Sequence, residues 1–166
     1  NLEDVQVNGT PFSPEEIEEL GKFKRGERVS YTDIGLAMER VFVRMKNAGY
    51  LKVAYKARRE LNMEKSTAKL FIDVEPGPQY RMGKLTLNGL DVVSEPVIRK
   101  MWTLQTGDPF RADYPDFFLN TVKERGVFDF LAGTQAKTAL DDERHTVDVT
   151  LIFKGGAQPL DSRKRR

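Results

Sequence analysis

Two kinds of hydrophobic pattern alternate along the chain. Apolar residues at every second position predict half-buried strands, whereas apolar residues three and four apart predict amphipathic helices. Strand-type alternation runs from Leu2, Val53, Ala68, Met82 and Val147, and the last of these stretches is the cleanest. Helix-type spacing occupies two stretches after the first strand and two stretches after the fourth. The pattern therefore predicts strands and helices in the order strand, helix, helix, strand, strand, followed by the same order again.

The second half of the chain repeats signals of the first half after about eighty residues, which indicates an internal duplication. The matching positions, in chain order, are Asn8–Gly9 with Asn88–Gly89, Ser13 with Ser94, Gly26 with Gly107, Gly49 with Gly126, and residues 67–72 with residues 146–151. The Asn-Gly pairs predict turns after the two opening strands, because glycine adopts positive φ without steric cost. Gly49 and Gly126 are placed to end the second helix of each repeat.

Local signals refine the helices. Ser13 followed by Glu16 predicts a capping box, and Ser94 is the expected N-cap of the matching helix in the second repeat. The apolar face expected for that helix consists of Val97, Ile98, Met101 and Trp102. The aromatic residues Trp102, Phe110, Phe117 and Phe118 could suggest a ligand pocket, but helical spacing favours a place in the core.

The predicted fold class is α+β, with two tandem βααββ units, each a three-stranded mixed sheet with two helices packed on one face. The expected limits are residues 1–77 and 78–156, followed by a basic tail over residues 157–166. The joint is Pro76, Gly77 and Pro78. Two prolines restrict the backbone and no flexible stretch follows, so the units are expected to be closely coupled.

Composition excludes several kinds of function. The 166 residues include no cysteine, and their net charge of +2 is too small to indicate nucleic-acid binding. No apolar run approaches the length of a membrane helix. The single histidine, His145, lies in a polar turn with no nucleophile beside it, and no phosphate-binding or calcium-binding motif occurs. We therefore expect no enzyme activity, no metal and no cofactor.

The order of these motifs resembles the polypeptide-transport-associated (POTRA) domain family. The resemblance is carried by the boundary phrase over residues 74–83, the strand end at Leu87–Gly89, the loop Gly107–Phe110 and the helix end Gly126–Phe128. The first repeat departs from the family pattern at Val29, where the loop aromatic is usual. The resemblance implies a scaffold at the periplasmic face of the bacterial outer membrane. Its implied partners are unfolded outer-membrane or secreted proteins, accessory assembly proteins and a β-barrel in cis, with no nucleic acid and no small-molecule substrate.

Such a scaffold is expected to bind extended clients by β-strand addition at a sheet edge. The candidate edge strand consists of Lys52, Val53, Ala54, Tyr55, Lys56, Ala57 and Arg58. Its apolar side chains alternate with basic ones, so one face can hold the core while the other stays in solvent. The basic side chains are equally consistent with binding and with guarding the edge against aggregation. The matching strand near Ala132–Thr138 contains Gly133 and is expected to be shorter or irregular, and to be the weaker acceptor.

Two other functions are compatible with parts of the pattern. One is a POTRA-type interaction module of another envelope or cell-division complex, which would bind one folded partner. The other is a nucleic-acid binder that uses the face of a small sheet. The acidic residues Asp73, Glu75 and Asp148 on the exposed strand faces argue against this second alternative.

Overall fold

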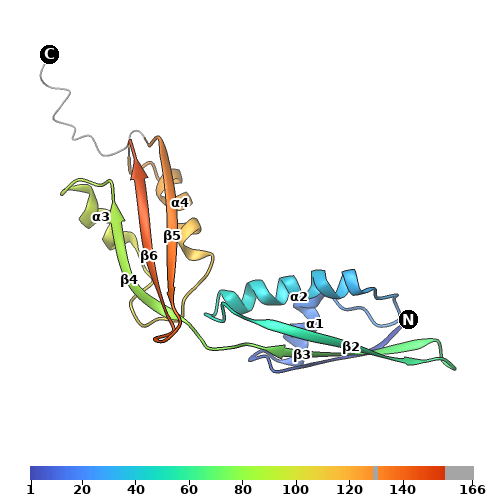
Figure 1. Cartoon of the computed structure of the whole chain (residues 1–166). Coiled ribbons are helices and arrows are strands. Elements are labelled where there is room, and N and C mark those ends of the chain that lie inside the picture. Colours follow the sequence, from blue (N-terminus) through green and yellow to red (C-terminus); the bar gives the residue numbers. More distant parts are fainter. Residues whose placement is uncertain (129–130, 156–166) are drawn as a thin grey trace, which may run out of the picture. The chain divides into compact units, whose positions relative to one another are not determined.

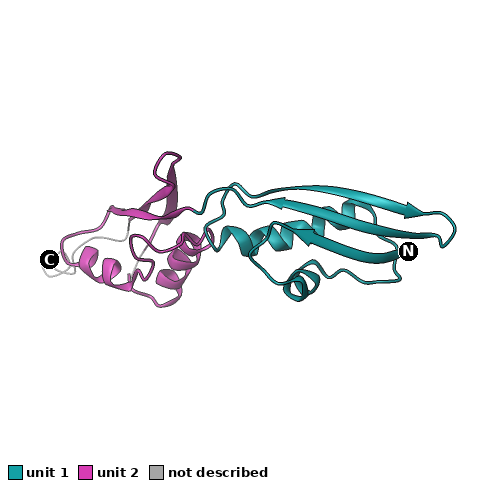
Figure 2. Cartoon of the chain, turned by 90° about the horizontal axis from the view of Figure 1, so that it is seen from below, with its two compact units in different colours: residues 1–79 teal, residues 80–166 magenta. Residues whose placement is uncertain are grey.

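The computed structural model describes residues 1–128 and 131–155, which form two compact units. The chain divides between Gln79 and Tyr80, so unit 1 is residues 1–79 and unit 2 is residues 80–166 (Figure 2). The expected joint at residues 76–78 lies just ahead of this division, and the limits of the individual domains remain a prediction. The expected basic tail, residues 157–166, lies outside the described residues.

Both units have the element order that the hydrophobic pattern predicts (Figure 1). Unit 1 consists of β1 (Leu2–Asn8), α1 (Pro14–Gly21), α2 (Tyr31–Lys46), β2 (Ala54–Asn62) and β3 (Thr67–Glu75). Unit 2 consists of β4 (Arg81–Asn88), α3 (Ser94–Met101), α4 (Tyr114–Glu124), β5 (Gly133–Asp141) and β6 (Thr146–Lys154). The prediction of two tandem βααββ units is therefore confirmed.

The last strand of each unit lies in the middle of its sheet. The strand orders are β1-β3-β2 and β4-β6-β5. The first strand pairs parallel with the middle strand, and the penultimate strand pairs antiparallel with it through a short hairpin. The sheets are therefore mixed, as predicted. The middle strands are also the most regularly alternating segments of the sequence, because they have neighbours on both sides and one fully covered face.

In each unit both helices lie on one face of the sheet (Figure 2). Unit 1 buries an aliphatic core, in which α1 and α2 contribute Ile17, Ile34, Met38, Val41 and Met45, and β3 contributes Leu70, Ile72 and Val74. A fully buried side chain of this kind contributes roughly 1.5–3 kcal/mol to folding. Most of the stability of so small a unit therefore depends on this single helix-to-sheet layer.

Unit 2 has the same layers with aromatic side chains in the core. The Trp102 ring lies 4.7 Å from the Tyr114 ring and 5.1 Å from the Phe118 ring, in edge-to-face geometry. The polar tips are bonded, since the indole nitrogen of Trp102 donates to Leu104 O and the Tyr114 hydroxyl accepts from the Thr103 amide. Phe110 is buried as well. The core placement expected for Trp102, Phe110 and Phe118 is confirmed.

Two side chains expected in this core are exposed instead. Phe117 is 53% exposed and its ring lies under the Arg111 guanidinium, while Val97 is 49% exposed. Each is the immediate neighbour of a buried residue, Phe118 or Ile98. Successive helical residues point about 100° apart, and on these short helices only one of each pair reaches the sheet.

The capping predictions have different outcomes in the two units. In unit 1 the Ser13 hydroxyl accepts from the Glu16 amide at 3.2 Å and the Glu16 carboxylate accepts from the Ser13 amide at 2.9 Å, so the capping box is confirmed. In unit 2 the prediction of Ser94 as N-cap is wrong. Ser94 is the first helical residue, and the Asp91 carboxylate accepts from its amide at 2.7 Å. The hydrogen bonds that the Asp91 carboxylate accepts, above all from the Ser94 amide, hold its pKa below the ordinary value.

The glycines that end β1 and β4 are fixed by close backbone contact. Gly9 has φ +83° and Gly89 has φ +85°. A Cβ atom on Gly9 would lie 2.1 Å from Val74 O, and one on Gly89 would lie 2.0 Å from Phe153 O. Each opening strand therefore leaves the sheet directly over the carbonyl of the middle strand, which is possible only for a residue with no side chain.

This contact predicts unequal effects of two alanine substitutions at positive φ. Gly89→Ala adds a steric clash with Phe153 O to the backbone strain, whereas Gly107→Ala, at φ +93° with open space around it, adds strain alone. We expect urea unfolding of Gly107→Ala to show a loss of about 1–2 kcal/mol, and that of Gly89→Ala a clearly larger loss. Equal losses for the two variants would contradict the close-contact explanation.

Candidate sheet-edge binding site

Each three-stranded sheet has two edges, and in unit 1 the edge at β1 is partly covered by the chain's own loop. The Leu2 amide donates to Glu27 O at 2.8 Å, and the Gly26 amide donates to Leu2 O at 2.8 Å. Both backbone groups of Leu2 are therefore taken by the loop between α1 and α2. The pairing of β1 with β3 is also irregular between Leu2 and Asp4, as a β-bulge requires.

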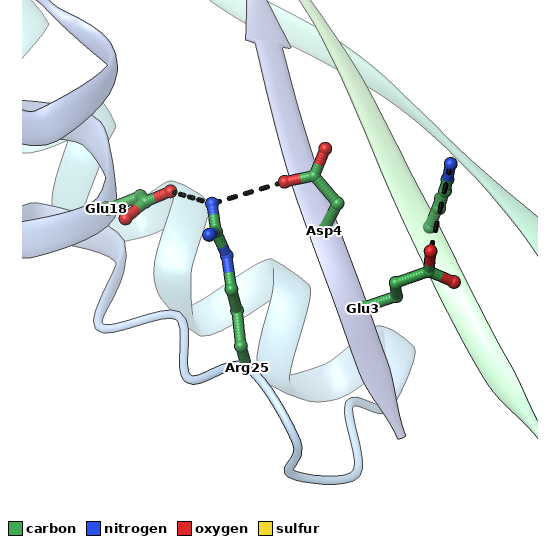
Figure 3. A network of polar contacts seen from close by, with 5 residues as sticks. Glu3, Asp4, Glu18 and Arg25 are labelled. Atoms are coloured by element: carbon green, nitrogen blue, oxygen red, sulfur yellow. Dashed lines mark hydrogen bonds and ion pairs between the residues drawn. The ribbon is translucent and has the colours of Figure 1, made fainter.

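An ion-pair bridge braces the same edge (Figure 3). Arg25, which follows α1, lies 3.2 Å from the Asp4 carboxylate on β1 and 3.0 Å from the Glu18 carboxylate on α1. On the other side of β1, the Glu3 carboxylate accepts from the Thr67 hydroxyl at 2.8 Å. These groups are largely solvent-exposed, so each ion pair contributes roughly 0–1 kcal/mol. The two contacts of Arg25 link the covering loop to β1 and α1, whereas the Glu3–Thr67 bond links β1 to β3.

Unit 2 covers the equivalent edge in the same way. The Met82 amide donates to Asp108 O at 2.8 Å and the Gly107 amide donates to Met82 O at 2.8 Å. The bulge that follows is filled by side chains, because the Asp148 carboxylate accepts from the Lys84 amide at 2.7 Å and the Thr106 hydroxyl donates to Gly83 O. A loop pairing plus a bulge is a known way to prevent strand addition at an edge. The sequence motifs located these loops but did not reveal their pairing.

The opposite edges, at β2 and β5, are long and open. Within the described residues β2 pairs only with β3, over all nine positions from Ala54 to Asn62, and β5 pairs only with β6, from Gly133 to Asp141. Backbone groups of alternate residues on each strand therefore face away from the sheet. Within the described residues, β2 and β5 are therefore the longest strands that are paired on one side alone.

The predicted edge strand is present but begins later than expected. β2 starts at Ala54, and Lys52 and Val53 lie ahead of it. Residues 51 and 52 belong to the turn that follows Gly49, which has φ +97°. The strand instead runs on to Asn62, beyond the predicted end at Arg58. Apolar and polar residues alternate poorly after Arg58, so the sequence did not predict the strand to run on to Asn62.

Side chains of β2 divide between two faces as the alternation predicts. Tyr55 and Ala57 are half-buried against the core, and the Tyr55 ring lies 5.6 Å from the Phe42 ring. Lys56 and Arg58 are exposed on the other face. The outer face is less basic than the sequence suggests, because Lys56 lies 3.4 Å from the Glu75 carboxylate and Arg58 is paired with Glu60. Long-range attraction of acidic segments is correspondingly reduced.

The expectation that the second edge strand is shorter or irregular is wrong, whereas its expected role as the weaker acceptor stays a prediction. β5 is nine residues long, as β2 is, and pairs with β6 without a break. Gly133 is its first residue and not an interior one, so it does not interrupt the strand. The outer face of β5 also carries fewer charges than that of β2, with Gln135, Lys137 and Ala139 at its centre. By its length and its weak charge protection, β5 is a second candidate acceptor.

The joint and the turn histidine have local structural roles. Gly77 adopts φ +67°, and the Gln79 side-chain amide donates to Ala48 O at 2.8 Å, within unit 1. His145 lies exposed in the β5–β6 turn at φ +52°, with its ring 5.7 Å from that of Tyr80. Among the described residues, no three His, Asp or Glu side chains come together as metal ligands. None of the described helices has the length and apolar content needed to cross a bilayer.

Solved structures of low sequence identity share this fold. POTRA domains 3–5 of BamA from Haemophilus influenzae align with a TM-score of 0.60 and 19% identity, over 93% of this chain and 66% of that one. BamA from Haemophilus ducreyi lacking POTRA domains 1–3 aligns with a TM-score of 0.64 and 16% identity, over 90% of this chain and 28% of that one. POTRA domains 1–2 of the periplasmic domain of Omp85 from Anabaena align with a TM-score of 0.52 and 11% identity, over 90% and 91% of the two chains.

These alignments show the fold: the chain consists of two tandem POTRA folds. This confirms the fold implied by the sequence resemblance. The chain spans less than two thirds of the length of either BamA structure. No family model matches the sequence, and no curated protein is significantly similar to it.

We expect the charged side chains on β2 to keep its open edge from pairing with a second copy of the protein. Replacing Lys56 and Glu60 by threonine removes two edge charges without changing the net charge, and we expect concentration-dependent association in sedimentation velocity. The matched control is the double threonine variant of their cross-strand partners on β3, Asp73 and Lys69. That variant changes the same face at the middle strand and is expected to behave as the wild type. If both variants associate alike, edge protection is not the cause.

The separation of acidic side chains predicts the response to metal ions. Calorimetric titration of the folded protein with Zn²⁺ or Ca²⁺ is expected to show no stoichiometric binding, because three ligands do not converge within the described residues. Stoichiometric binding that disappears in His145→Ala or Asp141→Asn would contradict this prediction.

Proposed function

We propose that this chain is the peptide-binding part of an outer-membrane protein assembly or secretion factor, located at the periplasmic face of the bacterial outer membrane. In this proposal the open edge of β2 accepts extended segments of unfolded client proteins by β-strand addition. The observation that carries the proposal is the asymmetry of the sheet. The β1 edge is closed at its start by a loop and a bulge, whereas all nine residues of β2 are unpaired on their outer side.

The structural neighbours support the general class of this function. They are POTRA domains of BamA and of the periplasmic domain of Omp85. A tandem scaffold of this fold acts by holding other proteins, which agrees with a chain that carries no recognisable catalytic constellation in its sequence. Accessory assembly proteins and a β-barrel in cis belong to the same proposal.

The free energies of backbone pairing and of ordering the client chain support transient binding at such an edge. A backbone hydrogen bond contributes a net ~0.5–1.5 kcal/mol, while ordering the backbone of each client residue costs about 1–2 kcal/mol. Backbone pairing alone therefore roughly balances its own cost. Net affinity must come from alternate client side chains that pack on the sheet beside β2, so many sequences can bind and none binds tightly.

An alternative is a POTRA-type module that binds one folded partner in another envelope or cell-division complex. The two functions differ in what the edge must recognise. A carrier accepts many extended segments, whereas a module with one partner accepts a single surface that includes side-chain contacts. The open, weakly patterned edge of β2 favours the carrier.

A proline scan of β2 from Ala54 to Arg58 tests the proposal. Proline removes one amide, and the amides of alternate residues face β3 and the open edge in turn. We therefore expect the variants to fall into two alternating sets. In one set the fold is destabilised, as circular dichroism will show. In the other the fold survives and titration with outer-membrane protein peptides, followed by NMR shifts, shows weakened binding.

The matched control is the same scan over Gln135–Lys137 on β5. If β2 is the acceptor, folded β5 variants bind peptides as the wild type does. Binding lost only in β5 variants would move the site to the second unit. The proposal is wrong if every folded variant of both strands binds normally, or if the shifts map to the helices.

A further inference from the structure

In unit 1 a single guanidinium group bridges the start of β1 and the helix α1 (Figure 3). The Arg25 side chain lies 3.2 Å from the Asp4 carboxylate and 3.0 Å from the Glu18 carboxylate. Both ion pairs use the same nitrogen of Arg25, Nη2, so the two carboxylates converge on one point. The same place can be located in unit 2, because the two units are built alike.

The backbone identifies the matching residue on β4. Leu2 and Met82 make the same two hydrogen bonds with the loop after the first helix, and the pairing with the middle strand shifts directly after each of them. Asp4 and Lys84 stand two residues further along their strands, at this bulge. A cation on β4 therefore takes the place of the carboxylate on β1.

The helix and the loop identify the other two positions. Ile17 is buried beneath α1 and Ile98 is buried beneath α3. The next residue is Glu18 in α1 and Arg99 in α3. Thr106 directly precedes the glycine of the covering loop, which is the place of the bridging guanidinium in unit 1. Unit 2 thus has two cations in place of two carboxylates, with an uncharged residue in place of the bridge.

An open cleft occupies this place in unit 2. It has a volume of about 530 Å³ and is lined by residues of β4, of the end of α3 and of the loop that follows, among them Lys84, Leu85, Arg99, Leu104 and Thr106. This volume is within the ~300–1,000 Å³ of sites that hold small organic groups. Within the described residues no aspartate or glutamate lines the cleft, whereas the two leucines give it apolar walls. The cleft therefore fits an anionic group that is carried on an apolar body.

The two cations differ in their present contacts. Within the part of the chain that the structure describes, the Lys84 ammonium has no hydrogen-bond or ion-pair partner, while its backbone amide donates to the Asp148 carboxylate at 2.7 Å. The Arg99 guanidinium donates to Leu85 O at 3.3 Å and lies 3.1 Å from the Glu95 carboxylate, with 49% of its side chain exposed. An incoming anion therefore meets one unpaired cation and one cation that is already held beside β4.

We propose that this cleft binds an acidic side chain of a partner protein, with its carboxylate between Lys84 and Arg99 and an adjoining apolar side chain on the leucines of the cleft. The bound carboxylate completes in unit 2, with opposite charges, the bridge that Arg25 makes in unit 1. A guanidinium matches the planar geometry of a carboxylate, and an ammonium adds a point charge at its oxygen atoms. The site lies at the covered edge of unit 2, so it does not depend on strand addition at β2.

NMR titration with two short peptides tests whether the cleft requires a carboxylate. The peptides are acetyl-Leu-Glu-Leu-amide and acetyl-Leu-Gln-Leu-amide, which differ only in that charge. We expect the glutamate peptide to bind more tightly, to shift the amide resonances of residues 82–85 and 99–106, and to lose affinity as the salt concentration rises. Inorganic phosphate lacks the apolar part and is expected to bind more weakly than the glutamate peptide.

Substitutions of single cations show whether the charge is used at this place. Lys84→Gln and Arg99→Gln are each expected to weaken binding of the glutamate peptide about two- to fivefold, as the loss of an exposed ion pair does. The matched control is Lys100→Gln, which removes the same charge from an exposed position on α3 that does not line the cleft. This variant is expected to bind the peptide as the wild type does.

A carboxylate built into the cleft gives the sharpest test. Thr106→Glu places an acid where unit 1 has its guanidinium, and we expect it to pair with the two cations and to abolish binding of the glutamate peptide. Thr106→Gln loses the same hydroxyl contact with Gly83 O but adds no charge, so it is expected to retain binding. The inference is overturned if the glutamine peptide or phosphate binds as tightly as the glutamate peptide, if Lys100→Gln weakens binding as much as Lys84→Gln, or if the two Thr106 variants bind alike.

Discussion

Unpaired backbone groups at the edges of a three-stranded sheet are the constraint on which this structure depends. A sheet of three strands has one middle strand and two edges, and every edge amide and carbonyl requires a partner or solvent. In both units the two edges of the sheet differ. The loop after the first helix pairs with Leu2 or Met82 and covers the start of one edge, and the nine-residue second strand is left open. The covering loop therefore makes the two edges of each sheet unequal.

The duplication shows which features of the fold are set by backbone geometry and which are not. The glycines over Val74 O and Phe153 O, the positive φ in both hairpin turns and the paired loops recur in both units. The cores differ, since unit 1 is aliphatic and unit 2 is built around the Trp102 ring and its neighbours. Close backbone contacts allow no substitution, whereas a core of the right volume can be filled in several ways.

Sequence patterns predicted the elements and their order because alternation and helical spacing are properties of neighbouring residues. They failed where the decisive contact depends on how a loop or turn folds. The covering loop is joined to Leu2 by backbone bonds that leave no mark on side chains. Asp91, and not Ser94, bonds the first amides of α3, which depends on how the turn after β4 folds back. The charge of Lys56 is offset by Glu75, whose proximity only the strand register reveals.

Tyr80 shows that the segment leading into β4 belongs to the core of unit 2. It follows the prolines at residues 76–78 and stands directly ahead of β4, and it is buried and bonded to Phe110 and Asp142. The residue that leads into β4 is thus a structural part of unit 2. Because β4 pairs with β6 and with the covering loop at Met82, a side chain anchored beside Arg81 also stabilises the start of both pairings. Anchoring the entry residue therefore supports the covered edge, and with it the difference between the two edges of the sheet.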